Sequence, residues 1–111
     1  MTKIYALQTA TMIGCALEGT AEWFMDFHSP HQTQDSALAM MIFTLNEIRD
    51  EDLVTMRAEY PQDKYCEADY AIRVSATTEK SSVHELVRRN GTDMIALAQM
   101  VITEAEVLEA A

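Results

Sequence analysis

The most apolar stretch of the chain, residues 35–49, has hydrophobic side chains at the spacing of an α-helix. They recur every three or four residues, as Ala37, Leu38, Met41, Ile42, Leu45 and Ile48. Met40 and Phe43 widen this stripe beyond half of the helix circumference. The pattern therefore predicts a central helix, buried on most sides, that ends near Arg49 because three consecutive acidic residues follow it.

The segment before this helix fits a β-hairpin better than a helix. Residues 3–17 are compatible with either a helix or a long strand, but residues 21–28 largely alternate between apolar and polar side chains. Residues 18–20 form a short polar break that contains glycine. A three-residue loop there brings apolar residues together on one face of the hairpin. The expected pairs are Leu17 with Ala21, Cys15 with Trp23, and Ile13 with Met25.

A second hairpin is predicted after the central helix. Residues 53–60 and 65–76 both alternate, and their apolar side chains fall on even positions. Pairing these apolar faces requires a loop with an odd number of residues around Pro61. We favour a three-residue loop, because a five-residue loop would place two glutamates opposite each other. The favoured register places Arg57 opposite Glu67, and Val54 opposite Tyr70.

Two helices are predicted at the C-terminal end. Ser82 and Glu85 have the spacing of a capping box, which favours a helix over residues 82–90 that Gly91 terminates. Residues 92–108 then repeat apolar side chains at helical spacing after a threonine that can act as a cap.

The expected fold is a single compact α+β domain over residues 1–111. Its order is strand, strand, helix, strand, strand, helix, helix, so we expect an antiparallel sheet of two hairpins packed against helices. The length of 111 residues suits one domain with its own core.

The strongest signal in the composition is negative charge. Eight lysines and arginines against 18 aspartates and glutamates give 8 − 18 = −10. This charge disfavours direct binding to nucleic acid, whose phosphates require cations, and favours a partner with a basic surface. No apolar run is long enough for a membrane span, and two cysteines are too few for a disulfide framework. Residues 12–15 loosely resemble a lipoprotein cleavage box, but polar residues interrupt the run before them, so we expect a cytoplasmic protein.

Catalytic and metal-binding motifs are weak in this sequence. Asp26, His28, His31 and Asp35 lie within ten residues, but the histidines flank a proline loop and lack helical spacing. Cys15 and Cys66 lie on apolar strand faces, which indicates structural thiols rather than nucleophiles. His84 and Glu85 near Arg88 and Arg89 are explained by capping and by a solvated helix face. We therefore expect no enzyme activity, no cofactor and no bound metal.

The acidic residues form two groups along the chain, and these provide the candidate site. One group, residues 47–52, lies at the end of the central helix, and the other surrounds the second predicted hairpin. If the groups meet in space, their carboxylates can imitate phosphates and cover the nucleic-acid site of another protein. The expected partner-binding residues are Glu47, Asp50, Glu51, Asp52, Glu67 and Asp69.

The favoured function is a non-enzymatic inhibitor or antagonist that binds a basic, nucleic-acid-processing partner. Small phage proteins that inhibit restriction or CRISPR systems share this size and charge, although no motif here places the chain in a family. One alternative is a self-associating structural or regulatory subunit, a homodimer formed through the methionine-rich central helix or the last helix. Another alternative is a domain that binds a small ligand in a pocket between sheet and helices.

Overall fold

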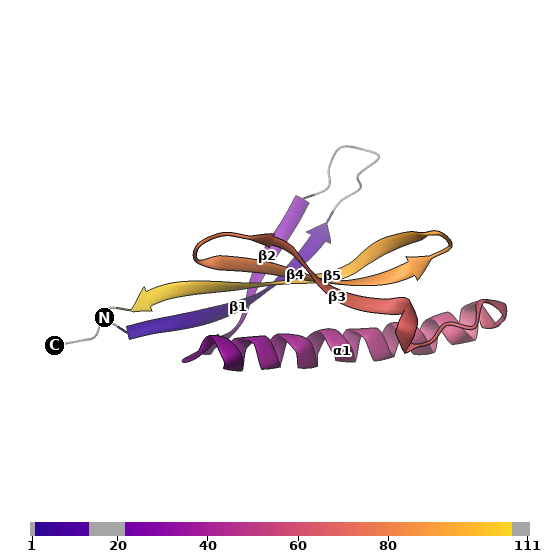
Figure 1. Cartoon of the computed structure of the whole chain (residues 1–111), viewed down its shortest axis with the longest axis horizontal. Helices are drawn as coiled ribbons and strands as arrows, with labels where there is room; N and C mark the ends of the chain where they lie inside the picture. The colour runs from indigo at the N-terminus through magenta and orange to yellow at the C-terminus, as the bar shows by residue number, and fades with distance from the viewer. Residues whose placement is uncertain (1, 14–21, 108–111) are drawn as a thin grey trace.

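A computed structural model describes residues 2–13 and 22–107 as one long helix packed against one face of an antiparallel sheet (Figure 1). The helix is α1 (Gln34–Glu59), and two short 3₁₀ turns, η2 (Pro61–Asp63) and η3 (Glu67–Asp69), follow it. The strands are β1 (Thr2–Ile13), β2 (Glu22–His31), β3 (Tyr70–Thr77), β4 (Ser81–Asn90) and β5 (Asp93–Val107). The expected α+β class with an antiparallel sheet is therefore confirmed, whereas the expected order of elements is wrong.

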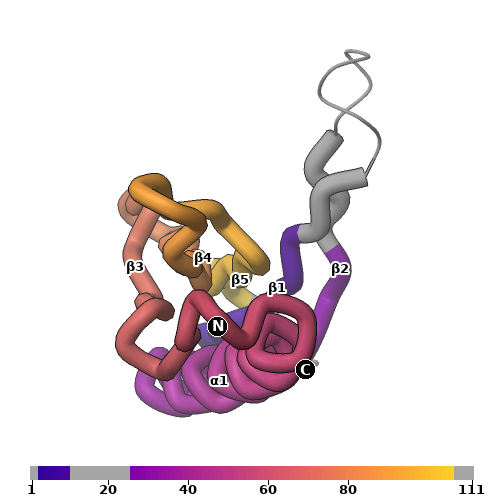
Figure 2. The backbone as a smooth tube through the Cα atoms, turned by 90° about the vertical axis from the view of Figure 1, so that its right-hand side faces the viewer, coloured from indigo at the N-terminus to yellow at the C-terminus, as the bar shows by residue number. Residues whose placement is uncertain are grey.

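The five strands are arranged in the order β2-β1-β5-β4-β3, so the last strand of the chain lies in the middle of the sheet. β5 pairs with β1 on one side, from Thr2 with Val107 to Ala10 with Gln99, and with β4 on the other. Seen from the end of the molecule, β1 and β2 rise on one side of α1, and β3 and β4 rise on the other (Figure 2). α1 therefore covers one face of the sheet and keeps its own opposite face uncovered.

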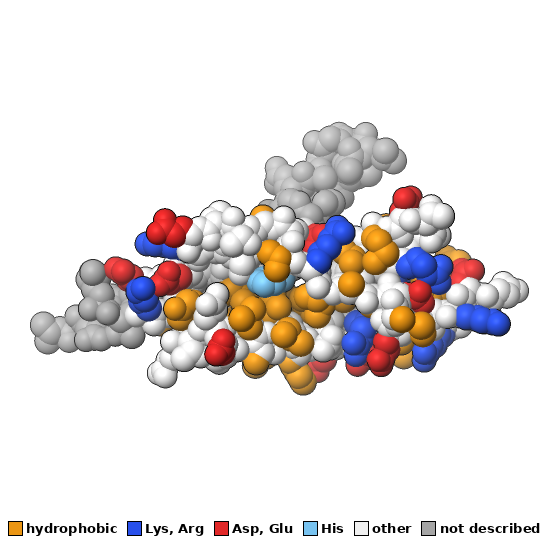
Figure 3. All heavy atoms as spheres, viewed as in Figure 1, with side chains coloured by type: hydrophobic (Ala, Val, Ile, Leu, Met, Phe, Trp, Pro, Cys, Tyr) orange, Lys and Arg blue, Asp and Glu red, His pale blue; other side chains and the backbone are white. Residues whose placement is uncertain are grey.

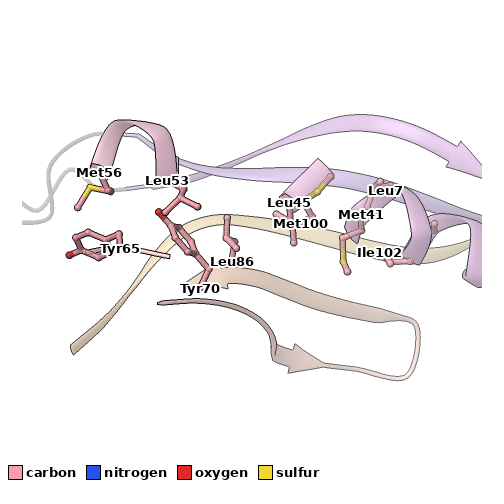
Figure 4. Close-up of a cluster of buried hydrophobic side chains, with 11 residues drawn as sticks. Leu7, Met41, Leu45, Leu53, Met56, Tyr65, Tyr70, Leu86, Met100 and Ile102 are labelled. Carbon is pink, nitrogen blue, oxygen red and sulfur yellow. The ribbon is translucent and has the colours of Figure 1, made fainter. Parts of the chain in front are cut away.

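Apolar side chains between α1 and the sheet form the core. Leu7, Leu45, Leu86 and Met100 are almost completely buried, and together they draw on β1, α1, β4 and β5 (Figure 4). Removing such large apolar side chains from water is the main contribution to the stability of the fold. Further members of the core are Ala37, Met41, Leu53, Met56, Tyr65, Tyr70 and Ile102.

α1 contains the predicted central helix and continues ten residues beyond it. Thr33 caps its start by accepting a hydrogen bond from the Ser36 amide, with 3.1 Å between Oγ1 and N. Residues 53–59, predicted as a strand, are helical because Leu53 and Met56 continue the inward-facing stripe and are buried. The predicted pairs of this segment with Glu67 and Tyr70 consequently do not form.

The predicted N-terminal hairpin is confirmed as β1 paired with β2, but its register differs from the prediction. Met25 pairs with Ala10 rather than with Ile13, and Trp23 pairs with Met12. Leu17 and Cys15, which take part in the other two predicted pairs, lie outside the described residues. The strands also contain an irregularity between Leu7 and Gln8, which shifts the pairing by one residue.

The two predicted C-terminal helices are wrong, because both segments are strands. β4 is buried on both faces from His84 to Arg88, so its sequence has no apolar and polar alternation. β4 and β5 are joined by a tight turn in which Gly91 has a φ of 66°, a value that glycine adopts without strain. Ser82 and Glu85 therefore lie on a strand, and the capping-box interpretation does not apply.

Candidate partner-binding surface

One side of α1 is not covered by any other described element. Because the helix packs on the sheet through one face only, side chains on the opposite face are free to contact a partner. Phe43 and Val54 are 59% and 71% exposed, and Met40 is 37% exposed. Glu47, Asp50 and Glu51 are exposed between these apolar residues. We name this surface the outer face of α1; it comprises Met40, Phe43, Glu47, Asp50, Glu51 and Val54.

The outer face of α1 has apolar ends and an acidic centre. Met40 and Phe43 lie toward the start of the helix, whereas Val54 lies near its end. Large exposed apolar side chains on one rigid element are typical of protein contact surfaces. The sequence pattern pointed to Met40 and Phe43 as buried residues, and the structure places both outside the core.

Three of the six acidic residues predicted to bind a partner belong to this outer face. Glu47 and Glu51 form no ion pair within the described part of the chain. Asp50 accepts hydrogen bonds from Arg49 at 2.9 and 3.0 Å, but its side chain is still 62% exposed. These three carboxylates are therefore accessible to a basic partner.

Asp52 points the other way, into the contact between α1 and the sheet. Both of its carboxylate oxygens accept hydrogen bonds from Nη1 of Arg88, at 2.7 and 2.9 Å. The hydroxyl of Tyr70 donates to the same carboxylate at 2.6 Å. Burial, followed by this hydrogen bond to Asp52, raises the pKa of Tyr70. Asp52 therefore joins α1 to β3 and β4 instead of facing solvent.

Asp69 and Glu67, in the turn before β3, are also associated with arginines. Asp69 accepts a hydrogen bond from Nε of Arg89 at 2.7 Å and another from the Cys66 amide at 2.8 Å. The hydrogen bond from Arg89, followed by that from Cys66, lowers the pKa of the Asp69 carboxyl. The side chain of Glu67 is 70% exposed, and its Oε1 lies 4.0 Å from Nη2 of Arg49.

Basic and acidic side chains consequently lie next to each other toward the C-terminal end of α1 (Figure 3). Arg49, Arg88 and Arg89 compensate charges that belong to both acidic groups of the sequence. The six predicted acids therefore do not form one uninterrupted negative surface. Glu47, Asp50 and Glu51 lie together on α1, Glu67 lies beside Arg49, and Asp52 and Asp69 stabilise the fold.

The histidines and cysteines take up other positions. His31 is hydrogen-bonded to Ser29 and to Ser36, both at 2.7 Å, and His28 contacts Ser29 at 3.1 Å. Within the described residues, no three histidine, cysteine or acidic side chains are grouped closely enough to hold a metal ion. Cys66 is exposed next to η3, so its predicted place on a buried strand face is wrong.

Glu85 lies on the face of β4 that points away from α1, where it is almost completely buried. It accepts hydrogen bonds from Arg73 on β3 and from Gln99 on β5. Although burial raises the pKa of this carboxyl, the two donors outweigh burial, and the net shift is downward. These contacts give Glu85 a structural role in joining three strands.

Two surface cavities lie at opposite ends of α1. One, of about 270 Å³, lies near the start of α1 and is lined by Tyr5, Gln34, Ile102, Glu104 and residues 77–82. The other, of about 300 Å³, lies at the end of α1 and is lined by Met56, Glu59, Tyr60, Asp63, Tyr65, Arg88 and Asn90. Among the charged residues that line this second cavity only Arg88 is buried, and its guanidinium is paired with Asp52. Neither cavity therefore presents an uncompensated charged group that is also buried.

His84 is a buried titratable group on the side of β4 that faces α1. Its side chain is hydrogen-bonded to Ser82 at 2.8 Å, and its cross-strand neighbours are Val74 and Met100. Burial lowers the pKa of His84, because a charged imidazolium is poorly solvated there. The unfolded chain therefore binds a proton at His84 more readily than the folded chain does.

We expect this residue to make stability dependent on pH. Because the pKa of His84 is lower in the folded than in the unfolded protein, the stability contribution of neutral His84 is complete above the unfolded pKa of about 6.5. The free energy of unfolding then decreases as the pH falls below that value. The loss stays below the single-proton limit of about 1.4 kcal/mol per pH unit. Urea unfolding of wild type and of His84→Gln between about pH 7.5 and 5.5 measures this. Parallel pH profiles for the two proteins would contradict the prediction.

No family model, curated protein or solved structure was found to match this chain. In the described part of the chain, no helix is both long enough and apolar enough to cross a membrane.

Proposed function

We propose that this chain is a non-enzymatic protein-binding domain that covers a basic surface of a partner through the outer face of α1. The observation that carries this proposal is the exposure of Glu47, Asp50 and Glu51 next to Phe43 and Val54 on one rigid helix. Carboxylates attract and orient a cationic partner, while exposed apolar side chains supply contact area. The net charge of −10 adds long-range attraction to the same class of partner.

In its more specific form, the proposal is that of an antagonist. A basic surface that the domain could cover is the phosphate-binding surface of a nucleic-acid-processing protein. Cytoplasmic inhibitors made by phages against restriction or CRISPR systems are the functional class with this size and charge. Three of the six predicted acids support this form. Asp52 and Asp69 are largely buried in ion pairs with Arg88 and Arg89, and Glu67 lies in η3 rather than on α1.

Self-association is the second proposal, and exposed apolar residues on α1 favour it. Of the two surfaces expected to form a homodimer, only α1 remains, because the predicted last helix is β5 in the middle of the sheet. Two copies joined through the outer face of α1 would bring their carboxylates together. The charge pattern therefore favours a different, basic partner over a second copy.

Reversing two charges on α1 tests the proposed function. We expect Glu47→Lys with Glu51→Lys to raise the Kd for a partner purified from the native host at least about tenfold, because attraction becomes repulsion. Binding by wild type should also weaken steeply as salt rises from about 0.05 to 0.5 M. Isothermal titration calorimetry on the purified pair measures both effects.

The matched control changes the same net charge elsewhere. Glu79→Lys with Asp93→Lys alters two exposed residues, one in the turn between β3 and β4 and the other at the start of β5. Each pair of substitutions gives 10 − 16 = −6, so the two variants have equal net charge. An equal loss of affinity in both would assign binding to overall charge and reject the outer face of α1 as the site.

A further inference from the structure

The outer face of α1 has the spacing of a coiled-coil seam. Met40, Phe43, Glu47, Asp50 and Val54 follow one another at intervals of three, four, three and four residues. This is the spacing that keeps side chains of one helix facing a second helix along its length. At a rise of about 1.5 Å per residue, the seam is about 21 Å long. It therefore offers a contact for three turns or more of a partner helix.

Glu47 and Asp50, at the centre of this seam, disfavour pairing with a second copy of α1. In a parallel pair, Glu47 would face its own counterpart, as would Asp50. In an antiparallel pair centred on the same region, Glu47 would face Asp50. Either arrangement buries like charges at the core of the contact, which is the kind of repulsive element that sets pairing specificity.

We propose that the outer face of α1 binds one cationic amphipathic helix of the partner. This inference rests on the proposed function and deepens it by naming the chemistry of the partner. The partner helix has Lys or Arg at the core positions opposite Glu47 and Asp50. It has apolar residues at the core positions on either side, opposite Phe43 and Val54. A single partner helix then forms ion pairs with the centre of the seam and apolar contacts with both of its ends.

Neighbouring residues on α1 fit this geometry. Ala39 and Ala58 flank the seam near its two ends, and small side chains at flanking positions allow close approach of a second helix. Glu51 flanks the centre and can pair with a further cation on the partner. Met40 is flexible and polarisable, so it can adapt to apolar side chains of different shape.

A pair of synthetic helical peptides tests the inference with the intact protein. The patterned peptide, of about three heptads, has leucines at its outer core positions and arginines at its two central core positions. The control peptide has the same composition, but its arginines occupy outer core positions and leucines occupy the two central core positions. We expect fluorescence anisotropy to give at least tenfold tighter binding of the patterned peptide. Glu47→Lys with Asp50→Lys should abolish this preference.

A phenylalanine elsewhere on the surface provides the matched control for the apolar end. Phe27 on β2 is 62% exposed, nearly the same as the 59% of Phe43. We expect Phe43→Ala to weaken binding of the patterned peptide at least fivefold, and Phe27→Ala to leave it unchanged. Circular dichroism on each variant confirms that the fold is retained.

The outcomes separate this inference from the proposed function. Equal binding of both peptides, or an equal effect of Phe43→Ala and Phe27→Ala, would reject the helical seam. Loss of partner binding on charge reversal, without binding of the patterned peptide, would also overturn the inference while leaving the proposed function intact. A dimer in light scattering that Phe43→Ala dissociates would identify a second copy as the occupant and overturn it as well.

Discussion

Replacing Asp52 by alanine should lower the free energy of unfolding by about 3 kcal/mol, because it leaves the guanidinium of Arg88 buried without its partner. Removing one member of a buried ion pair typically costs about 3–5 kcal/mol. We expect the lower end of this range, since the Asp52 side chain is 22% exposed. The Tyr70 hydroxyl also loses its acceptor. Urea unfolding followed by circular dichroism measures the change.

Asp50 is the matched control, since it lies two residues away on the same helix and is exposed. We expect Asp50→Ala to change the free energy of unfolding by no more than about 0.5 kcal/mol. Equal destabilisation by the two substitutions would contradict the structural role of Asp52. If the ion pair is the cause, Arg88→Met in the Asp52→Ala background should recover much of the lost stability, because an apolar side chain tolerates burial.

This arrangement explains why the candidate site could be predicted only in part. The sequence places Asp52 next to Asp50 and Glu51, so all three resemble one acidic patch. Arg88, which pairs with Asp52, lies 36 residues further along the chain. Arg89, which pairs with Asp69, lies 20 residues beyond it. Charge patterns in a sequence reveal only near neighbours, whereas the sheet brings β4 against α1. Local charge therefore overestimates the exposed acidic surface.

The fold was predictable where one face of an element is exposed. β2 alternates between apolar and polar side chains, and the first part of α1 repeats apolar side chains at helical spacing, whereas the segment of β1 fits a strand or a helix. β4 and β5 are interior strands that are buried on both faces over residues 84–88 and 100–102, and such a segment resembles a buried helix. The pair Asn90-Gly91 is the local signal that favours a hairpin at this point.

Leu45 and Phe43, two residues apart on α1, give the second large prediction. Leu45 is fully buried in the core beside Met100 (Figure 4). We expect Leu45→Ala to lower the free energy of unfolding by about 3 kcal/mol, because the substitution removes buried apolar surface and leaves a cavity. Phe43→Ala should change it by no more than about 0.5 kcal/mol, because Phe43 is mostly exposed.

The contrast between these two variants separates packing from binding. A small domain has only about 5–15 kcal/mol of stability, so Leu45→Ala should visibly shift the urea midpoint while Phe43→Ala does not. The binding measurement should reverse this order, because Phe43 lies on the proposed contact surface whereas Leu45 is buried in the core. Destabilisation by Phe43→Ala as large as that by Leu45→Ala would mean that the outer face of α1 is packed in the folded protein. The partner helix would then have no exposed seam to bind.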